Sequence, residues 1–161
     1  MVRVLILALL IATMTFSIFY TTPETDSIKH IAISNEFIKK NKSSLMEIVR
    51  VGADSPSIQY INPSMDSMGP QYGNFSGQDD RNFKWLKNEA QKLNIKAIIF
   101  ERDSTILESV SFTLYSRGLA ISGSGYGVSF YLENGHPKNP TDYRELEEKG
   151  WYFREYVNKN I

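Results

Sequence analysis

A chain of 161 residues has room for one domain and a short additional segment, because a typical domain contains roughly 100 to 150 residues. Hydrophobic residues make up 42% of the sequence, which predicts a folded protein rather than a disordered chain. The 18 basic residues balance the 18 acidic ones, which excludes a strong overall field for nucleic acid or anionic lipid. Because cysteine is absent, disulfides, thiolate metal sites and cysteine nucleophiles are excluded, and a bacterial envelope protein is favoured over an exported eukaryotic domain.

The first 21 residues are predicted to be a signal anchor or a signal peptide. Residues 4–20 contain no charged side chain and follow Arg3, whereas Glu24 and Asp26 come shortly after them. Because positive charge favours the cytoplasmic side, we expect the amino terminus to remain inside and the rest of the chain to cross the membrane. The uncharged segment is longer than a usual signal core of about 7 to 15 residues, and no Ala-x-Ala cleavage site follows it. We therefore expect a protein that is anchored in the inner membrane and faces the periplasm or the outside. Cleavage, which would give a periplasmic or secreted protein, is the alternative.

Residues 22–161 are predicted to form a single exported α+β domain that begins with a long helix. Thr22 is a suitable cap, Pro23 suits the first helical position, and acidic residues follow near the positive end of the helix dipole. Apolar residues then recur close to one helix face as far as Val49, which predicts an amphipathic helix that ends near Gly52.

A long loop and a second helix are expected next. Residues 53–80 lose the helical periodicity and are rich in Ser, Pro, Gly, Asn and Met, although residues 57–61 could form a short strand at a sheet edge. Asp79 or Asp80 is expected to cap the second helix, whose apolar residues repeat at spacings of three and four. Asn94 is a suitable left-handed residue to end this helix.

The rest of the chain is predicted to form an antiparallel β-meander of four to five strands, on which the two helices pack. From residue 95 onward the apolar period changes from that of a helix to the two-residue period of strands. The expected elements are strands at residues 95–100, 106–115, 126–133 and 151–157, with a turn at residues 101–104 between the first two strands and a short helix at residues 140–149 before the last strand. The first of these strands is apolar at almost every position, which predicts a central strand buried on both faces. The expected core under the second helix consists of Phe112, Leu114, Val128, Phe130, Trp151 and Phe153.

The motifs that suggest catalysis or cofactor binding do not meet their structural requirements. The glycine-rich residues 123–127 lead into a strand rather than a helix and lack the lysine of a phosphate-binding loop. Glycines in a strand instead predict a bulge, or a helix or aromatic ring that lies against bare backbone. His30 and His136 have no companion at metal-ligand spacing. We therefore expect no cofactor and no metal site.

One hydrolase arrangement is kept as an alternative. His136 could act as a base for Ser122 or Ser124. Asp142 would then orient the imidazole. This arrangement needs the fold to bring separate segments together, whereas a surface turn is sufficient to explain His136 alone. We therefore predict that neither His30 nor His136 carries out chemistry.

One face of the predicted meander combines small hydroxyl residues with tyrosines. Tyrosine gives a large contact area at low entropic cost and serine adapts its hydrogen bonds, so this composition is typical of recognition surfaces. The long loop adds methionines, which can repack against varied surfaces. The candidate partner-binding residues are Tyr115, Tyr131, Tyr152, Arg154 and Tyr156 on the meander and Met65, Met68 and Tyr72 on the loop. A face that simply meets water or packs against the helices is the alternative explanation.

The sequence therefore favours a non-enzymatic binding module of the envelope, such as an inhibitor or immunity-type protein, with a protein partner and no nucleic-acid partner. A small-molecule or lipid-binding protein is the second hypothesis, and a hydrolase is the third. A flat, exposed tyrosine face would support the first hypothesis and a deep apolar pocket the second. Convergence of His136, Ser124 and Asp142 would support the third. In each case residues 1–20 are expected to provide the contact with the membrane.

Overall fold

The computed structural model describes residues 23–64, 77–117, 124–132 and 135–157 of the chain. The predicted leader lies outside these residues, as do the candidate residues Met65, Met68 and Tyr72. No helix within the described ranges is both long enough and apolar enough to cross a membrane. The described part is an α+β fold, as the sequence predicts.

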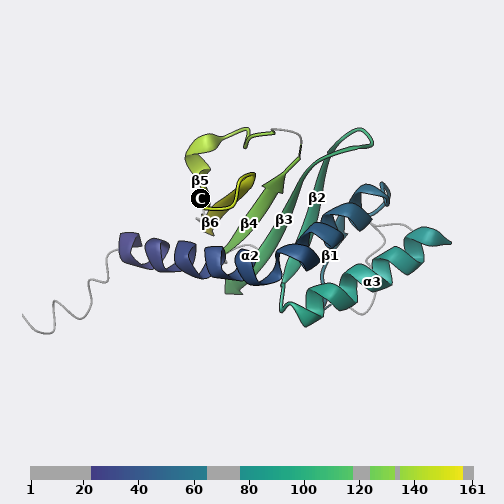
Figure 1. Cartoon of the computed structure of the whole chain (residues 1–161), viewed down its shortest axis with the longest axis horizontal. Coiled ribbons are helices and arrows are strands. Elements are labelled where there is room, and N and C mark those ends of the chain that lie inside the picture. Colours follow the sequence, from purple (N-terminus) through teal and green to yellow (C-terminus); the bar gives the residue numbers. More distant parts are fainter. Residues whose placement is uncertain (1–22, 65–76, 118–123, 133–134, 158–161) are drawn as a thin grey trace, which may run out of the picture.

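The described elements form one antiparallel sheet and two helices (Figure 1). In chain order they are α2 (Pro23–Ala53), β1 (Tyr60–Ile61), α3 (Gln78–Lys92), β2 (Ala97–Asp103), β3 (Ile106–Arg117), β4 (Ser124–Tyr131), the 3-10 helix η2 (Pro140–Asp142), β5 (Tyr143–Glu145) and β6 (Trp151–Val157). The six strands lie in the order β1-β2-β3-β4-β6-β5. The sheet therefore contains the predicted meander, but it exceeds four to five strands because two short segments, β1 and β5, pair with its edges.

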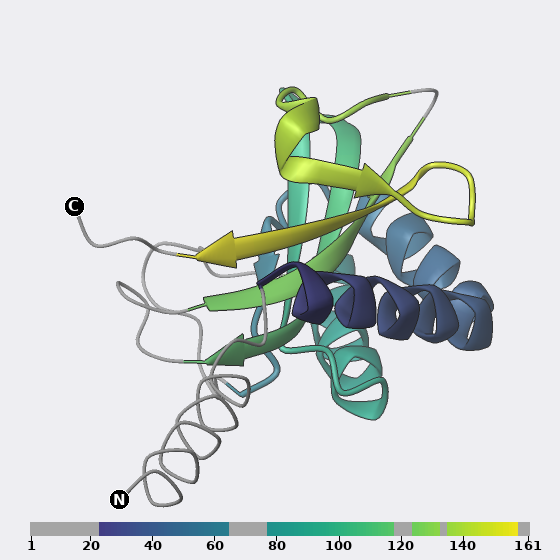
Figure 2. The same ribbon diagram turned by 90° about the vertical axis from the view of Figure 1, so that its left-hand side faces the viewer.

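Helix α2 confirms the predicted long helix and is the helix that lies over β3, β4 and β6. Its buried residues Ile38, Leu45 and Ile48 belong to the same apolar cluster as the buried sheet residues. The helix has 31 residues and is therefore roughly 46 Å long, which is enough to cross several strands. It contacts β3, β4 and β6, whereas α3 packs against α2 and β1. Figure 2 shows that both helices lie on the same side of the sheet. The prediction that the six core residues of the sheet pack under the second helix is therefore wrong, although α3 adds buried Leu86 and Ala90 to the same apolar cluster.

Four of the six predicted core residues are buried, namely Phe112, Val128, Trp151 and Phe153. The ring of Trp151 lies with its centroid 5.8 Å from that of Phe112 and 5.1 Å from that of Phe130. Leu114 and Phe130 are only partly buried and pack against the edge of this cluster. The core therefore sits between α2 and the middle strands of the sheet.

Helix α3 begins without the aspartate cap that the sequence suggests. Gly77, which has no side chain, occupies the cap position, and Asp79 and Asp80 lie inside the first turn. There their charges favour the positive end of the helix dipole, and Asp79 also accepts a hydrogen bond from Ser57. The cap prediction is wrong, but the predicted end of the helix is confirmed, because Asn94 has a left-handed φ of 55°.

Strand β2 is buried on one face only. Ile98 and Phe100 are buried, but Ile99 between them is 40% exposed, so the prediction of two buried faces is wrong. The reason is that both helices cover the same side of the sheet. The strand also continues to Asp103, through residues that the sequence predicts as a turn. β1 pairs with the outer side of β2, which confirms the edge strand predicted within residues 57–61.

The segment before the last strand is mostly extended instead of helical. Only Pro140–Asp142 is helical, as a single 3-10 turn, and Tyr143–Glu145 then pairs with β6 at the edge of the sheet. A short helix is marginal without strong packing, whereas the edge of β6 offers hydrogen bonds to an extended segment. The prediction of a helix at residues 140–149 is therefore wrong beyond its first turn.

Candidate functional site

The sheet face opposite the helices is hollow along its middle strands. Ser111 of β3 lies beside Ser129 of β4, and Thr113 lies beside Gly127. The hydroxyl oxygens of Ser111 and Ser129 are 2.7 Å apart and form a hydrogen bond. Because all four residues are small, their side chains rise less far above the sheet than those of the flanking strands. These four residues form the floor of a depression that we call the sheet groove.

Larger side chains stand on both sides of this floor. β1 and β2 contribute Tyr60, Ile99 and Glu101, and β6 contributes Arg154 and Tyr156. The hollow between them has a volume of about 560 Å³. Because three interstrand spacings separate β2 from β6, the backbones of the two wall strands are roughly 14 Å apart. The sheet groove therefore has room for one extended chain or for a small ligand.

Glycine is required where backbone and ring approach β4 most closely. A Cβ atom at Gly127 would lie 2.3 Å from the carbonyl oxygen of Phe112, and one at Gly125 would lie 2.5 Å from the hydroxyl of Tyr156. The Tyr156 hydroxyl passes over Gly125 and donates a hydrogen bond to the carbonyl oxygen of Tyr115 at 3.3 Å. The prediction that these glycines let an aromatic side chain lie against bare backbone is therefore confirmed at Gly125.

A β-bulge turns Tyr115 away from the groove. The register between β3 and β4 shifts between Thr113 and Tyr115, so that Tyr115 pairs with Tyr126. The two rings stack with centroids 5.7 Å apart, and Tyr126 stacks in turn on His30 of α2. Tyr115 therefore lies on the helix side of the sheet and not beside the other candidate tyrosines.

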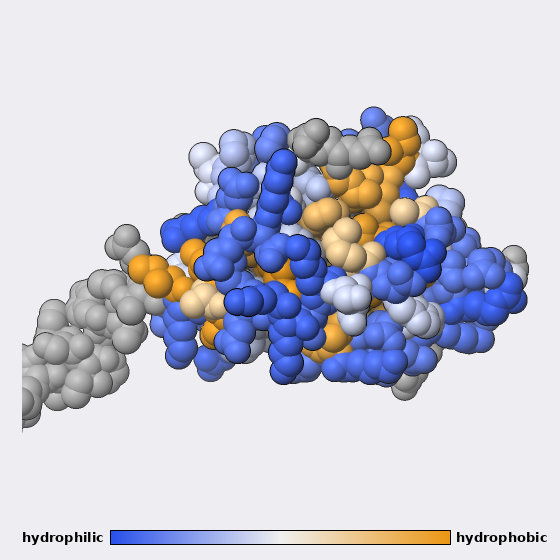
Figure 3. Space-filling model, in the orientation of Figure 1, coloured by the Kyte–Doolittle hydropathy of each residue, from blue (hydrophilic) through white to orange (hydrophobic). Residues whose placement is uncertain are grey.

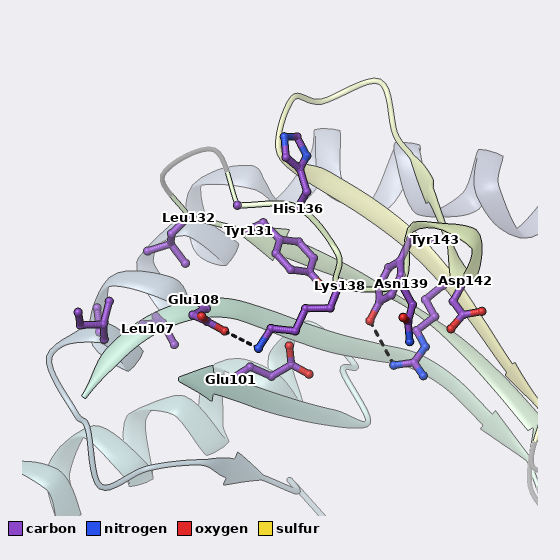
Figure 4. A pocket seen from close by; sticks show the side chains of 14 residues that line it. Glu101, Leu107, Glu108, Tyr131, Leu132, His136, Lys138, Asn139, Asp142 and Tyr143 are labelled. Carbon is purple, nitrogen blue, oxygen red and sulfur yellow. Dashed lines mark hydrogen bonds and ion pairs between the residues drawn. The ribbon is translucent and has the colours of Figure 1, made fainter. Parts of the chain in front are cut away.

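A second hollow, which we call the end pocket and which Figure 4 shows, shares Glu101 and Arg154 with the sheet groove. It has a volume of about 540 Å³ and lies between the β2-β3 hairpin, the end of β4 and residues 135–143. One side of it is apolar and is lined by Ala53, Ile106, Leu107 and Leu132. Figure 3 shows apolar surface over the tip of the β2-β3 hairpin, where Ile106 is 70% exposed. At the rim, Lys138 pairs with Glu108 at 3.3 Å.

The polar side of the end pocket is organised around Tyr131. The ring of Tyr131 meets the rings of Tyr143 and Tyr152 edge-on, with centroids 6.1 Å and 5.4 Å away. Arg154 donates a hydrogen bond to the Tyr143 hydroxyl at 3.2 Å, and its guanidinium lies 5.3 Å from the centre of that ring. Burial, hydrogen bonding to Tyr143 and the nearby charge of Glu101 raise the pKa of Tyr131. The Tyr131 hydroxyl therefore stays protonated well above neutral pH.

Two opposite charges stand on opposite walls and line both hollows. Glu101 on β2 accepts a hydrogen bond from Ser109 at 2.6 Å, and Arg154 on β6 is held by Tyr143. Because β3 and β4 lie between their strands, the two charges stand apart. A ligand at the junction of the groove and the pocket would meet Glu101 on one side and Arg154 on the other.

The candidate tyrosines are less exposed than a flat recognition surface requires. Tyr152 is only 8% exposed, and its hydroxyl is 2.9 Å from Nδ1 of His136. Tyr131 and Tyr156 are half-buried. Tyr152 therefore supports the ring of Tyr131, while Tyr131, Arg154 and Tyr156 present surface to the two hollows. The face is a groove rather than a flat tyrosine surface.

The residues of the hydrolase hypothesis are not all brought together. Ser124 lies at the start of β4, whereas His136 follows the opposite end of that strand. Asp142 lines the end pocket together with His136, and Ser122 lies outside the described residues. His30 of α2 stacks on Tyr126 of β4 and hydrogen-bonds to a carboxylate oxygen of Glu155 at 2.9 Å. Among the described residues, no three His, Asp or Glu side chains gather closely enough to hold a metal ion.

Three residues that shape the site are missing from the sequence-based candidates. Tyr60 lies in the predicted loop, Glu101 in a predicted turn and Tyr143 in a predicted helix. Only Glu101 had a usable signal, because it continues the two-residue alternation of Ala97 and Ile99. The acidic and polar residues that follow Glu101 favour a turn more strongly than this alternation favours a strand, so the sequence predicts a turn there.

No family model matches this chain, and no curated protein or solved structure matches it either. Its function is therefore inferred from the groove and the end pocket themselves.

Proposed function

We propose that this chain is a non-enzymatic binding protein that holds a segment of a protein partner in the sheet groove. The observation that carries the proposal is a concave sheet face, with a floor of small hydroxyl residues between walls of tyrosine, arginine and glutamate. Tyrosine and arginine are enriched among the residues that dominate the energy of protein interfaces. A hollow with such walls excludes water from a bound segment, which strengthens polar contacts inside it.

The arrangement of the histidines supports binding rather than hydrolysis. His136 is engaged with the hydroxyl of Tyr152 at 2.9 Å, and Ser124 lies at the far end of β4. A nucleophile and its base must come within hydrogen-bonding reach of each other. The described residues therefore offer no Ser-His pair for a covalent mechanism at this site.

A small-molecule ligand is the second candidate, and the end pocket favours it. Its volume of about 540 Å³ falls within the roughly 300 to 1,000 Å³ of typical ligand pockets, and it combines an apolar side with a few polar groups. However, the pocket shares Glu101 and Arg154 with an open groove of mixed polarity, whereas a lipid site is expected to be deep and apolar. The combined shape therefore suits a protein segment better.

We further propose that residues 1–21 hold the protein at the membrane, with the domain facing the periplasm or the outside. The basis is the uncharged segment at residues 4–20 between Arg3 and the acidic residues that follow. Fractionation of a tagged full chain tests this, because the tag is expected with the membrane or outside the cytoplasm. A chain that stays soluble in the cytoplasm with residues 1–20 intact would contradict it.

Crosslinking of the full chain in its native envelope, followed by identification of the crosslinked partner, tests the binding function. Arg154→Ala is expected to weaken binding of that partner by about tenfold or more, which corresponds to about 1.4 kcal/mol. Arg144→Ala is the matched control. Arg144 is an exposed arginine on the neighbouring strand β5, but it is in register with buried Phe153 and therefore faces the helix side.

Three outcomes are distinguishable. Loss of binding by Arg154→Ala but not by Arg144→Ala would support the proposal. Equal affinities for both variants would contradict it. Native mass spectrometry that finds a bound small molecule, released by Arg154→Ala, would replace the protein partner with the second candidate.

A further inference from the structure

We infer that the partner segment in the sheet groove is an extended peptide that carries an acidic and a basic side chain three residues apart. This inference rests on the proposed function and specifies the chemistry of the partner. Three features carry it: the hydroxyl floor, the opposite charges of the two walls, and the register that sets the distance between them.

The floor suits the backbone of an extended peptide. Ser111 and Thr113 carry hydroxyl groups that can donate and accept hydrogen bonds, although Ser111 already shares one hydrogen bond with buried Ser129. These hydroxyls match peptide N–H and C=O groups in either chain direction. In an extended chain successive side chains point to opposite sides, while the N–H and C=O groups point roughly at right angles to them. A peptide whose backbone faces the floor therefore directs successive side chains toward opposite walls.

The two walls of the groove carry opposite charges, and a bound peptide is expected to carry the complementary ones. The guanidinium of Arg154 makes one hydrogen bond within the described part of the protein, to Tyr143, and its further N–H groups can bind a carboxylate. On the opposite wall, the carboxylate of Glu101 accepts a hydrogen bond from Ser109 and can also accept one from a basic side chain. Lys96, the other charged residue of the groove, donates to Asn94. A complementary peptide therefore places an acid at Arg154 and a base at Glu101.

The register of the sheet sets the distance between the two charges along the groove. Glu101 of β2 pairs with Ser109 of β3. Arg154 of β6 pairs with Gly127 of β4, which pairs with Thr113 of β3. Ser109 and Thr113 are four residues apart, so the Cα atoms of the two charged residues are offset by roughly 13 Å along the strands. Both residues line both hollows, so we infer that their side chains lean toward the junction of the hollows and that the charged groups are offset by slightly less than this along the strands.

The alternation of an extended peptide then selects one spacing. Side chains at odd spacings point to opposite sides, with offsets of roughly 3 Å for i and i+1, 10 Å for i and i+3, and 16 Å for i and i+5. Only i and i+3 suits a separation slightly shorter than about 13 Å. Side chains at i and i+2, or at i and i+4, point to the same side and cannot reach both walls. The expected pattern is therefore an acidic residue and a basic residue with two residues between them.

Selection from a random dodecapeptide library displayed on phage, with the full chain as the target, tests this pattern. Among the selected peptides, acid-base pairs three positions apart are expected to be enriched over pairs two or four positions apart. These even spacings are internal controls, because they contain the same residues and differ only in the wall that each side chain faces. Enrichment of even spacings, or of peptides without such a pair, overturns the inference.

Variants of the full chain then test the two charges with a selected peptide. Glu101→Gln and Arg154→Gln are each expected to weaken binding by about tenfold, whereas Arg144→Gln on the helix side is expected to leave it unchanged. A double variant that exchanges the charges, Glu101→Arg with Arg154→Glu, is expected to recover binding. The reason is that a peptide turned end for end places its acid at position 101 and its base at position 154, and the floor hydroxyls accept either direction.

Failure of this inference and failure of the proposed function give different results. If partner binding depends on Arg154 but selected peptides lack the predicted spacing, the groove binds a protein in another way, and only the inference is overturned. If the exchanged double variant does not recover binding while it unfolds like the parent chain, the pairing of charges is also refuted. If the library yields no peptide that is enriched on the parent chain relative to the Arg154→Gln variant, the proposal that an extended peptide occupies the groove is overturned. If, in addition, the crosslinked partner binds Arg154→Ala as well as the parent chain, the proposed function fails too.

Discussion

Replacement of Phe112 by alanine is expected to lower the free energy of unfolding by about 3 to 5 kcal/mol, as for other buried phenylalanines. Phe112 is 1% exposed, lies between Ile98 of β2 and Val128 of β4, and stacks on Trp151. Because these neighbours are themselves held in register by the sheet, they cannot close the cavity that the missing ring would leave. In a chain of this size the melting temperature is expected to fall by roughly 6 to 20 °C, since 1 kcal/mol corresponds to about 2 to 4 °C. Urea unfolding of the full chain, followed by circular dichroism, measures the change.

Two nearby residues provide controls for this prediction. Ser111 faces the groove, and Ser111→Ala removes its hydrogen bond to Ser129. The free energy of unfolding is therefore expected to fall by only about 1 kcal/mol. Phe130→Ala also removes a phenyl ring, but from a half-buried position. It is therefore expected to lower the free energy of unfolding by less than Phe112→Ala does. Equal and small losses for Phe112→Ala and Ser111→Ala would refute the assignment of these neighbours to opposite faces of the sheet.

Two further predictions concern the packing of α2 and the titration of Tyr131. Gly52→Ala is expected to cost about 1 to 3 kcal/mol, because its Cβ would lie 2.1 Å from the buried ring of Phe100; unchanged urea unfolding would contradict this close packing. Since the folded protein raises the pKa of Tyr131 above the ordinary value of 10.0, this residue contributes stability that is complete below that pH and is lost as the pH rises toward the folded pKa. Tyr131→Phe is therefore expected to make the alkaline loss of stability shallower in urea unfolding above pH 10, and an unchanged slope would refute the cause assigned to the shift.

The local pattern of the chain was sufficient for elements whose signals are continuous along the sequence. The long helix α2 follows from the recurrence of apolar residues at helical spacing, together with a proline at its first position. The end of α3 follows from the tolerance of Asn94 for a left-handed conformation. The meander follows from the change to a two-residue period, and the close approach of a ring at Gly125 follows from glycine itself. Each of these features depends on residues within a few positions of one another.

The face on which a side chain lies was not always accessible from this pattern. One extra residue in the bulge between Thr113 and Tyr115 turns Tyr115 to the helix side, and the alternation of apolar and polar residues does not reveal the bulge. Residues 143–145 form a strand because the edge of β6 is available to them, although their local signal favours a helix. Backbone hydrogen bonds to a neighbouring strand outweigh a weak local preference, and the sequence alone does not say which segment becomes the neighbour.

The candidate site depends on such long-range neighbours throughout. The groove exists because small residues of β3 and β4 are aligned in register, with Ser111 beside Ser129. Its charges come from β2 and β6, and Glu101 and Arg154 share a hollow only because the strand order places two strands between them. The residue types that suit recognition were therefore determined by the sequence itself. Their union into a groove was decided by the tertiary structure, because strand register is set by the packing of the whole core and not by the residues of any one strand.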